Sequence, residues 1–363
     1  MKKNDILVVY GDQIKQMTKM LLEASKIEEL IGDRHKKIGL KPNLILSKPA
    51  SSGATTHPEI VAATIEYLQS KGFEDITIME GSWIGDVTSR AFNVCGMNEV
   101  ARKYNVPIVD TQKDTYHTYN CAGLNLSICD AAMNVDFMIN MPVMKGHCQT
   151  VVTCALKNMK GIIPNKEKRH FHTMGLHKPI AHLNTKVHHE FILVDAICGD
   201  LDFEEGGNPV PMNQMFAMRD PVLCDAYACE VMGHDIEDVD YIGIAEDLGV
   251  GCADISKANI IELNKPAASR NLKLSRRIDR LARKANAQDA CSACYASLIH
   301  ALARMDEMGA LDDLNEKVCI GQGFKGKTGK LGVGACTCKF DRYVKGCPAK
   351  GSDILDFLMD EVE

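Results

Sequence analysis

Short apolar runs alternate with segments of helical periodicity along the first part of the chain. The apolar runs Asp5–Tyr10, Asp75–Glu80 and Phe191–Ala196 are bounded by turn residues and predict buried strands. Between such runs, apolar residues recur at spacings of three and four, as in Pro58–Lys71, and predict amphipathic helices. Strands that alternate with helices are typical of βαβ units, so the pattern predicts an α/β fold with a mostly parallel sheet flanked by helices.

The pattern changes near residue 266. Residues 266–288 are strongly basic, with an apolar stripe at Leu274, Ile278 and Leu281, and predict a linker helix whose basic face could dock an acidic redox partner. The part from residue 289 onwards is rich in Cys, and its Gly- and Lys-rich segment 325–351 is expected to be too irregular to bury a core alone. We therefore predict three parts: an α/β domain over 1–265, the basic linker over 266–288, and a small Cys-rich domain over 289–363.

Composition narrows the class of protein. The 363 residues are 45% hydrophobic and 25% charged, which is ordinary for a globular chain. Neither a signal-peptide region nor a run of about 18 apolar residues is present, so we expect a cytoplasmic location and no membrane partner. A net charge of −6 and an aromatic content of 6% argue against a nucleic-acid partner.

The densest group of titratable residues follows the predicted strand Val135–Met141. Lys145 and His147 come directly after this strand. Helical spacing from Val151 to Met159 then predicts a helix that ends at Gly161, followed by a His-rich loop. A strand end, a Gly turn and a helix N-terminus form a favourable anion site in an open α/β sheet.

Other predicted strand ends carry polar residues as well. Lys41 and Asn43 follow one strand and Glu80 ends another, while His57 precedes Pro58 at a helix start. Ligands bind beyond the carboxyl ends of parallel strands, so these residues are expected to line one polar, basic crevice.

Candidate roles follow from residue chemistry. A histidine can supply a proton, a carboxylate can orient it or act as a base, and lysines can stabilise developing negative charge. The alternatives are a solvated loop for the lysines and histidines and simple capping roles for His57 and Asp195. A metal in the His-rich loop fits no specific spacing signature. The catalytic candidates are Lys145, His147, His170 and Asp195, and the candidates for binding a small anionic substrate or cofactor are Lys41, Asn43, His57, Lys157, Lys160 and Arg169.

Fifteen cysteines are many for a reducing compartment, where a Cys cluster indicates metal binding before disulfides. A C-x-x-C pair supplies two corners of a [4Fe–4S] cluster, and later loops can supply the other two. Zinc is the competing interpretation, although zinc ribbons usually show two C-x-x-C pairs. Cys338 could replace Cys336, and Cys319 is expected to be packed in a strand. The predicted cluster ligands are Cys291, Cys294, Cys336 and Cys347.

A set of motifs resembles the uncharacterised domain-of-unknown-function 362 (DUF362) family. This resemblance implies the α/β fold and, since members often carry an iron–sulfur module, the cluster, but no settled reaction. The order CxxC, GxC, GCP at the end of the chain also looks like the proximal-cluster pattern of nickel–iron hydrogenase small subunits, with Ala349 in place of a second Pro. The family motifs are Lys41–Asn43, Thr55–Pro58, Met144–His147, Cys154–Pro164, Val194–Ile197 and the Asp220-Pro221 helix start.

These observations predict an iron–sulfur oxidoreductase of an anaerobic or microaerobic bacterium or archaeon. It would pass electrons from a [4Fe–4S] cluster to an anionic substrate or cofactor in the crevice. The alternatives are a non-redox lyase or isomerase with a structural or Lewis-acid cluster, and an electron carrier without chemistry of its own. The chain has no GxGxxG, Walker A or radical-SAM motif, whereas flavin sites lack a short obligatory motif and stay open.

Overall fold

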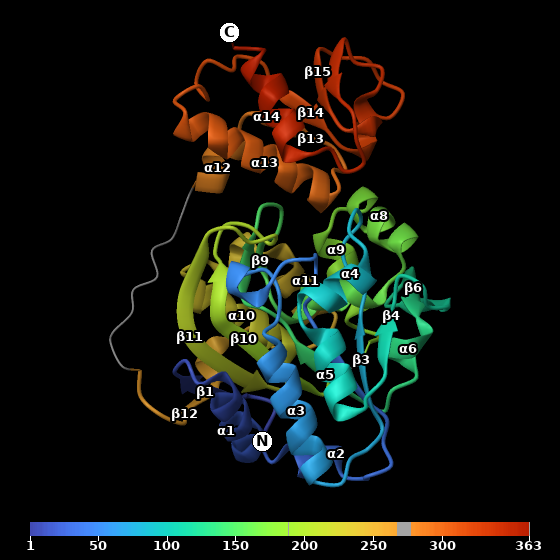
Figure 1. The fold of residues 1–363 in the computed structure, drawn as a ribbon, viewed down its shortest axis with the longest axis vertical. Coiled ribbons are helices and arrows are strands. Elements are labelled where there is room, and N and C mark those ends of the chain that lie inside the picture. The colour runs from blue at the N-terminus through green and yellow to red at the C-terminus, as the bar shows by residue number, and fades with distance from the viewer. Residues whose placement is uncertain (188, 267–276, 363) are drawn as a thin grey trace. The chain divides into compact units, whose positions relative to one another are not determined.

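The computed structural model describes residues 1–187, 189–266 and 277–362 (Figure 1). The chain divides into two compact units, Met1–Glu167 with His177–Leu274 and Lys168–Leu176 with Ser275–Glu363, called here the N-terminal and C-terminal units. Much of the predicted basic linker lies outside the described residues, which resume with the short helix α12 (Arg277–Ala282). Within the described parts of the chain, no helix is long and apolar enough to cross a membrane.

An eight-stranded sheet forms the centre of the N-terminal unit (Figure 1). Its strand order is β12-β1-β11-β10-β7-β2-β3-β4. All neighbouring strands are parallel except those beside β11, which runs antiparallel to both β1 and β10. The predicted mostly parallel α/β sheet is therefore confirmed. The strands are β1 (Asp5–Tyr10), β2 (Ile38–Pro42), β3 (Ile76–Glu80), β4 (Ile108–Asp110), β7 (Phe137–Met141), β10 (Phe191–Asp200), β11 (Pro209–Met218) and β12 (Asn259–Glu262).

Both faces of this sheet are covered, as the near-continuous apolar strands require. Alternate residues such as Leu7 and Leu193 pack with the first helices in one buried cluster. Residues that point to the opposite face, such as Val194 and Phe216, are also fully buried. The ring centroids of Phe216 and Tyr227 of α10 lie 5.3 Å apart. The helices are α1 (Ile14–Ser25), α2 (Ile27–Ile31), α3 (Pro58–Ser70), α4 (Thr88–Val94), α5 (Met97–Tyr104), α6 (Asp130–Met133), α7 (Ala155–Asn158), α8 (Asn165–Thr173), α9 (His177–Leu183), α10 (Pro221–Met232) and α11 (Asp240–Asp247).

Two β-hairpins lie outside the main sheet. The pair β5 (Tyr116–Cys121) and β6 (Leu124–Cys129) is antiparallel, and so is the pair β8 (Lys145–His147) and β9 (Val151–Thr153). The second hairpin corrects the prediction of a helix from Val151, because the helix α7 begins only at Ala155. Three consecutive β-branched residues favour a strand there, and the turn after His147 lets β9 fold back on β8.

The segment predicted as a His-rich loop is instead helical. Arg169, His170 and His172 lie on α8, whereas His177 and His182 lie on α9. The first helical segment is divided into α1 and α2, because Lys26 adopts a left-handed conformation with φ of 53° between them. Short 3₁₀ segments are η1 (Ala50–Ser52), η2 (Met159–Ile162), η3 (Ile236–Asp238), η4 (Ile255–Lys257), η5 (Gln322–Phe324) and η6 (Ala335–Thr337).

The C-terminal unit is more regular than its composition suggested. It contains an all-parallel four-stranded sheet, ordered β13-β14-β15-β16, together with α12, α13 and α14. This unit has its own buried core. The fully buried side chains in it include Leu298, Leu302, Val318, Ile320 and Ile354. The segment 325–351, which was expected to be irregular, contains the strands β15 and β16, whose period is concealed because they are very short and lie among glycines. Its elements are β13 (Ala285–Ala287), α13 (Ser292–Glu307), β14 (Val318–Ile320), β15 (Leu331–Val333), β16 (Arg342–Val344) and α14 (Gly351–Met359).

Candidate functional site

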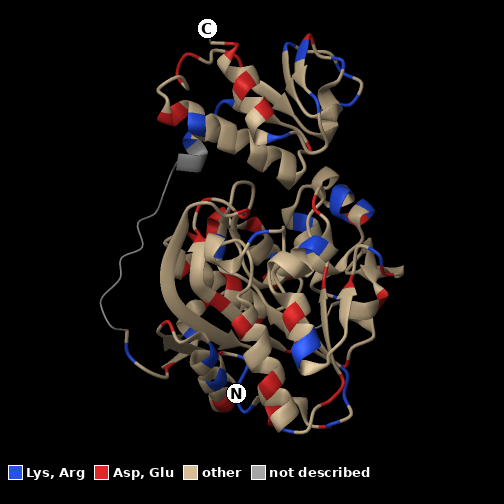
Figure 2. Ribbon diagram, in the orientation of Figure 1, with Lys and Arg blue, Asp and Glu red and all other residues tan. Residues whose placement is uncertain are grey.

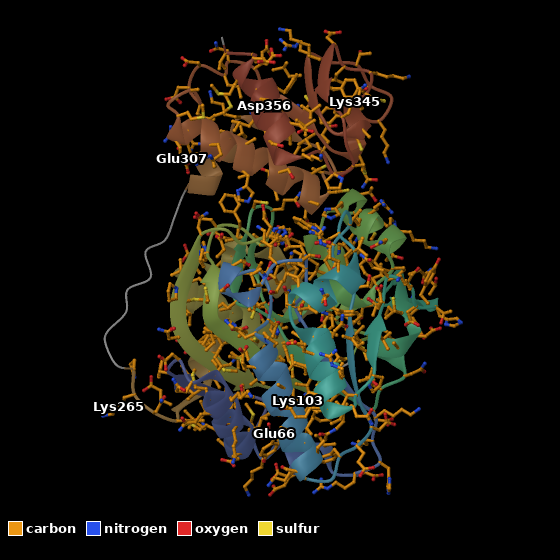
Figure 3. All side chains as sticks on the ribbon, in the orientation of Figure 1. Glu66, Lys103, Lys265, Glu307, Lys345 and Asp356 are labelled. Atoms are coloured by element: carbon orange, nitrogen blue, oxygen red, sulfur yellow. The ribbon has the colours of Figure 1, made fainter. Side chains whose placement is uncertain are left out.

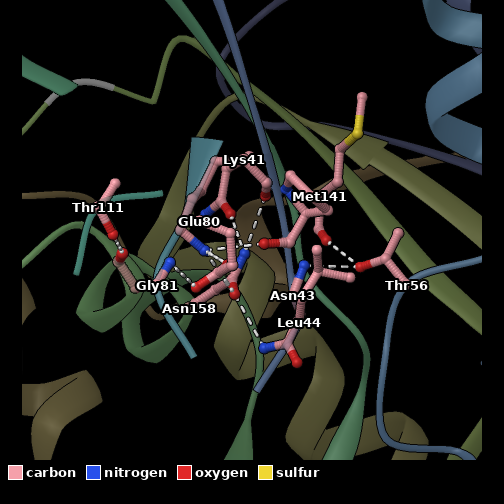
Figure 4. Close-up of polar contacts among 12 residues, drawn as sticks. Lys41, Asn43, Leu44, Thr56, Glu80, Gly81, Thr111, Met141 and Asn158 are labelled. Carbon is pink, nitrogen blue, oxygen red and sulfur yellow. Dashed lines mark hydrogen bonds and ion pairs between the residues drawn. The ribbon is translucent and has the colours of Figure 1, made fainter. Parts of the chain in front are cut away.

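A buried ion pair joins the carboxyl ends of two adjacent parallel strands, β2 and β3 (Figure 4). Lys41 Nζ contacts Glu80 Oε2 and also donates to the backbone oxygen of Pro42 at 2.8 Å and to Asn158 Oδ1 at 3.3 Å. Burial lowers the pKa of Lys41, and the carboxylate of Glu80 opposes that shift. A Cβ at Gly161 would lie 2.0 Å from Glu80 Oε1 and 2.6 Å from Lys41 Nζ, so the pair requires glycine there.

Asn158 on α7 connects this ion pair to the neighbouring strands (Figure 4). Its Oδ1 accepts from Asn43 Nδ2 at 2.9 Å, while its Nδ2 donates to the backbone oxygen of Lys41 at 3.2 Å and to Asn140 Oδ1 at 2.7 Å. Asn140 Nδ2 in turn donates to the backbone oxygen of Ala155 at 2.9 Å. The amide groups therefore fix α7 against the edge of the sheet through a satisfied buried network.

Lys145 occupies a pocket of oxygen atoms. Its Nζ donates to Asn43 Oδ1 at 3.0 Å, to the backbone oxygen of Ala54 at 2.5 Å and to the backbone oxygen of Glu204 at 2.8 Å. Burial lowers the pKa of Lys145 to about 7. Three acceptors match the three N–H bonds of an ammonium group, so the surroundings are built for the charged form.

Glu204 accepts two partners inside the same network. Its Oε2 lies 2.5 Å from Lys157 Nζ, and its Oε1 lies 3.0 Å from His147 Nε2, although that N–H is not aligned for a good hydrogen bond. His147 Nδ1 accepts from the backbone N–H groups of Gln149 and Thr150 at 3.0 and 3.1 Å, which assigns the ring proton to Nε2.

The titration of this group follows from its burial. Burial lowers the pKa of His147 to about 4, so the imidazole is neutral at pH 7. Burial alone would raise the pKa of Glu204, but His147 and Lys157 outweigh it and hold that pKa well below its usual value. The result is a carboxylate and an ammonium paired away from water, beside a neutral histidine.

A second histidine, His57 at the start of α3, is held by Asp195 of β10. The Asp195 Oδ2 atom accepts from the His57 backbone N–H and contacts His57 Nδ1, both at 2.8 Å. Burial opposes protonation of His57, but Asp195 outweighs it and raises the pKa of the imidazole. Asp195 is fully buried, whereas the His57 side chain retains 13% exposure. Its Nδ1 therefore donates to the carboxylate, and Nε2 is left as the acceptor.

The structure thus brings most of the predicted crevice residues into one part of the N-terminal unit, but as a buried, internally paired network. Lys41, Lys145 and Lys157 are at most 6% exposed. Lys160 lies in η2 and is half-buried. Arg169 and His170 lie on α8, in the segment that belongs to the C-terminal unit.

Sequence reasoning missed the groups that complete the network, namely Glu204, Asn140 and Asn158. Glu204 lies in the acidic, Gly-rich segment after β10, far along the chain from the lysine it pairs with. The two asparagines sit inside apolar stretches, where an amide that must be satisfied is itself a signal.

A separate group of two cysteines and one aspartate lies at the start of α7. The ligand atoms of Cys154, Cys224 and Asp225 all lie within 4.8 Å of one another, and the two Sγ atoms are 3.8 Å apart. Asp225 accepts from the backbone N–H of Ala155 at 2.6 Å, and burial raises its pKa to about 7. Asp225 is therefore paired and caps the start of α7.

The four predicted cluster cysteines come from separate elements of the C-terminal unit. Cys291 is the N-cap of α13, Cys294 lies in its first turn, Cys336 lies in η6, and Cys347 follows β16. Burial raises the pKa of the Cys294 thiol to about 11, and Cys291, Cys347 and Cys336 are near enough to add to that shift.

Neighbouring groups shape the surroundings of these sulfurs. Gln322 Nε2 donates to Cys291 Sγ at 3.7 Å, and a Cβ at Gly334 would lie 3.4 Å from Cys294 Sγ. Cys319 is on β14, where Asn286 Nδ2 lies 3.7 Å from its sulfur. Cys338 is exposed. The donor set, four thiols at a helix N-terminus and two Gly-rich turns, fits a metal cofactor.

Comparison with known proteins gives a family match and two partial likenesses. The model of the family described as "Domain of unknown function (DUF362)" matches residues 38–230, just over half of the chain. The thylakoid-associated protein sll1697 of Synechocystis sp. is 30% identical over 141 residues, which are 39% of this chain and 42% of that protein. The chain thus spans less than half the length of this curated relative.

Among solved structures, the lactate racemase apoprotein from Thermoanaerobacterium thermosaccharolyticum resembles the chain with a TM-score of 0.42 and 15% identity. The alignment covers 62% of this chain and 57% of that one. At this level the likeness supports no statement about a shared activity.

Proposed function

The chain belongs to the DUF362 family, and from that premise we propose that it is an iron–sulfur oxidoreductase. In this proposal the C-terminal unit holds one [4Fe–4S] cluster through Cys291, Cys294, Cys336 and Cys347. The N-terminal unit binds a small anionic substrate or cofactor at the carboxyl edge of its sheet. We further propose a cytoplasmic location, since the cluster ligands need a reducing compartment.

The single observation that carries the proposal is the gathering of four thiols around Cys294. When bound, a [4Fe–4S] cluster supplies or accepts one electron at a time. The amide groups at the N-terminus of α13 favour negative charge, which suits a thiolate-bound cluster. Lys325 also acts on Cys336 and favours its thiolate form, against the effect of burial.

The cysteine pattern favours a cluster over a single zinc ion. Zinc ribbons usually show two C-x-x-C pairs, whereas the C-terminal unit has one such pair, Cys291 and Cys294, and its second pair, Cys336 and Cys338, is C-x-C.

In the N-terminal unit, the residue best suited to move a proton is His57. Its Nδ1 is oriented by Asp195, its pKa is raised, and its side chain is the more exposed member of the pair. His147 is fully buried with a pKa of about 4, so we assign it to positioning Glu204. Lys41, Lys145 and Lys157 already have internal partners, so in this proposal they support the site and do not act on the substrate directly.

The test is a redox titration of anaerobically purified protein followed by paramagnetic resonance. The proposal predicts a reversible one-electron reduction of the cluster at low potential. A cluster that neither reduces nor oxidises reversibly would reject the oxidoreductase proposal.

A second candidate is a non-redox lyase or isomerase with a structural or Lewis-acid cluster. It is favoured by the His57–Asp195 pair, whose geometry suits acid–base work without any electron transfer. A redox-silent cluster together with proton–deuterium exchange into a bound carboxylate, lost in His57→Gln, would favour this candidate. An electron carrier would tolerate His57→Gln in every assay.

A further inference from the structure

Basic charge is concentrated in one stretch of the C-terminal unit. Of the 42 Lys and Arg and 48 Asp and Glu in the chain, residues 317–350 contain eight basic residues and one acidic residue, Asp341. This stretch therefore carries a net charge of +7, while the rest of the chain carries −13. Figure 2 shows Lys and Arg in the loops beside β15 and acidic residues on α14.

The basic side chains face solvent. Lys325, Lys327, Lys339, Lys345 and Lys350 are all exposed. Within the described residues, none of these five lies within ion-pair distance of a carboxylate; the pairs in this stretch are Lys330 with Glu316 at 2.5 Å and Arg342 with Glu361 at 2.6 Å. Lys325 and Lys327 donate to the side-chain oxygens of Gln322 and Gln288, both at 3.2 Å. Exposed charges outside ion pairs do little for stability, but their summed field reaches outward.

The same loops carry the least covered cysteines of the unit. Cys338 and Cys347 are exposed, whereas Cys291, Cys294, Cys319 and Cys336 are half-buried. Lys339 follows Cys338 directly, and Lys345 precedes Cys347 by two residues. The positive field therefore surrounds the side of the thiol group that is open to solvent.

We propose that the loops of residues 317–350 form a docking face for an acidic electron-transfer protein. The inference rests on the proposed iron–sulfur function. It assigns docking to the loops around the exposed cysteines Cys338 and Cys347, called here the rim, in place of the basic linker that the sequence suggested. A complementary acidic patch would be steered to this rim, and one electron would pass between the partner's centre and the cluster with no bond made or broken.

A nucleic acid fits this face less well. Recognition of single strands uses exposed aromatic rings on which bases stack. Of the three aromatic residues in this stretch, Phe324 and Phe340 are buried against each other, with ring centroids 5.7 Å apart, and Tyr343 is half-buried. The lysines also project from loops on a small sheet, without a helix that could enter a groove.

The test measures binding of a plant-type [2Fe–2S] ferredoxin, used as an acidic probe, to the full chain at increasing salt. We expect binding that weakens at least tenfold between 20 and 200 mM NaCl, as exposed charges are screened. The double variant Lys327→Glu/Lys345→Glu should weaken binding at low salt by tenfold or more and lose the salt dependence.

The matched control is Lys15→Glu/Lys103→Glu, which changes the net charge equally with exposed lysines of the N-terminal unit; Figure 3 labels Lys103 and Lys345. The control should bind as the unaltered protein does. Iron content and the visible spectrum are recorded for every sample. A missing cluster refutes the proposed function, whereas an intact cluster with equal binding by both double variants overturns the docking face alone. Tighter binding of a single-stranded RNA oligomer than of ferredoxin at the same salt also overturns it.

Discussion

Lysine side chains are used in opposite ways in the two units. In the N-terminal unit, Lys41, Lys145 and Lys157 are buried, and each ammonium group meets a carboxylate or a set of backbone and amide oxygens. In the C-terminal unit, lysines such as Lys327 and Lys345 are exposed and without ion pairs among the described residues. The first group holds a fold together, and the second produces an electrostatic field.

This difference between the lysines of the two units shows that a cluster of lysines in a sequence does not by itself indicate an anion site. Desolvating an ammonium group costs several kcal/mol unless partners compensate, so a buried lysine depends on its particular carboxylate. An exposed lysine keeps its hydration and contributes through charge alone. Substitutions in the two units should therefore differ in what they change and by how much.

The largest effect is expected for the buried pair of Lys41 and Glu80. Glu80→Gln would leave the Lys41 ammonium without its carboxylate and should lower the free energy of unfolding by about 3–5 kcal/mol, measured by urea denaturation. The double variant Lys41→Met/Glu80→Leu should recover most of this loss, because an apolar pair removes both charges. Equal stability of Glu80→Gln and the unaltered protein would show that the charge pair is unimportant.

The next effect is a pH dependence caused by His147. Its folded pKa of about 4 lies below the ordinary value of 6.5, so the unfolded state binds a proton that the folded state excludes between these values. The free energy of unfolding should therefore fall as pH drops from 6.5 towards 4, by up to about 3 kcal/mol from this group. Subtracting the pH profile of His147→Gln isolates the contribution, and parallel profiles would contradict the predicted burial of a neutral ring.

A smaller effect is expected from the glycine beside the same ion pair. Gly161→Ala would place a methyl group against Glu80 Oε1 and Lys41 Nζ and should cost about 1–3 kcal/mol. Gly243→Ala in α11 is the matched control, since no atom lies within 4 Å of its Cβ and alanine favours a helix. Thermal melts of both variants measure this cost, and we expect Gly161→Ala to melt at the lower temperature. Equal melting temperatures would argue against the close approach at Gly161.

The smallest effect belongs to the exposed lysines. Lys345→Glu should change the free energy of unfolding by less than about 0.5 kcal/mol, because the side chain makes no ion pair among the described residues. Urea denaturation of this single variant beside Glu80→Gln completes the comparison. A loss of several kcal/mol would place Lys345 among the structural lysines.

The strand ends and the start of α3 could be predicted because their signals are local. An apolar run that ends in Lys41 or Glu80 marks the carboxyl edge of a sheet, and Pro58 marks the first turn of a helix behind His57. The partner of Lys157 could not be predicted, since Glu204 lies 47 residues away in a loop whose path depends on tertiary packing. The β9 strand was missed because Val151 and Val152 also fit a helical spacing.

The central claim, that four thiols of the C-terminal unit hold an iron–sulfur cluster, is tested most directly by counting iron, sulfide and zinc in anaerobically purified protein. We predict about four iron atoms and four sulfides per chain. The cluster should be lost in Cys294→Ser and retained in Cys319→Ser. One zinc ion per chain without iron, or disulfide bonds among Cys291, Cys294, Cys336 and Cys347, would contradict the account.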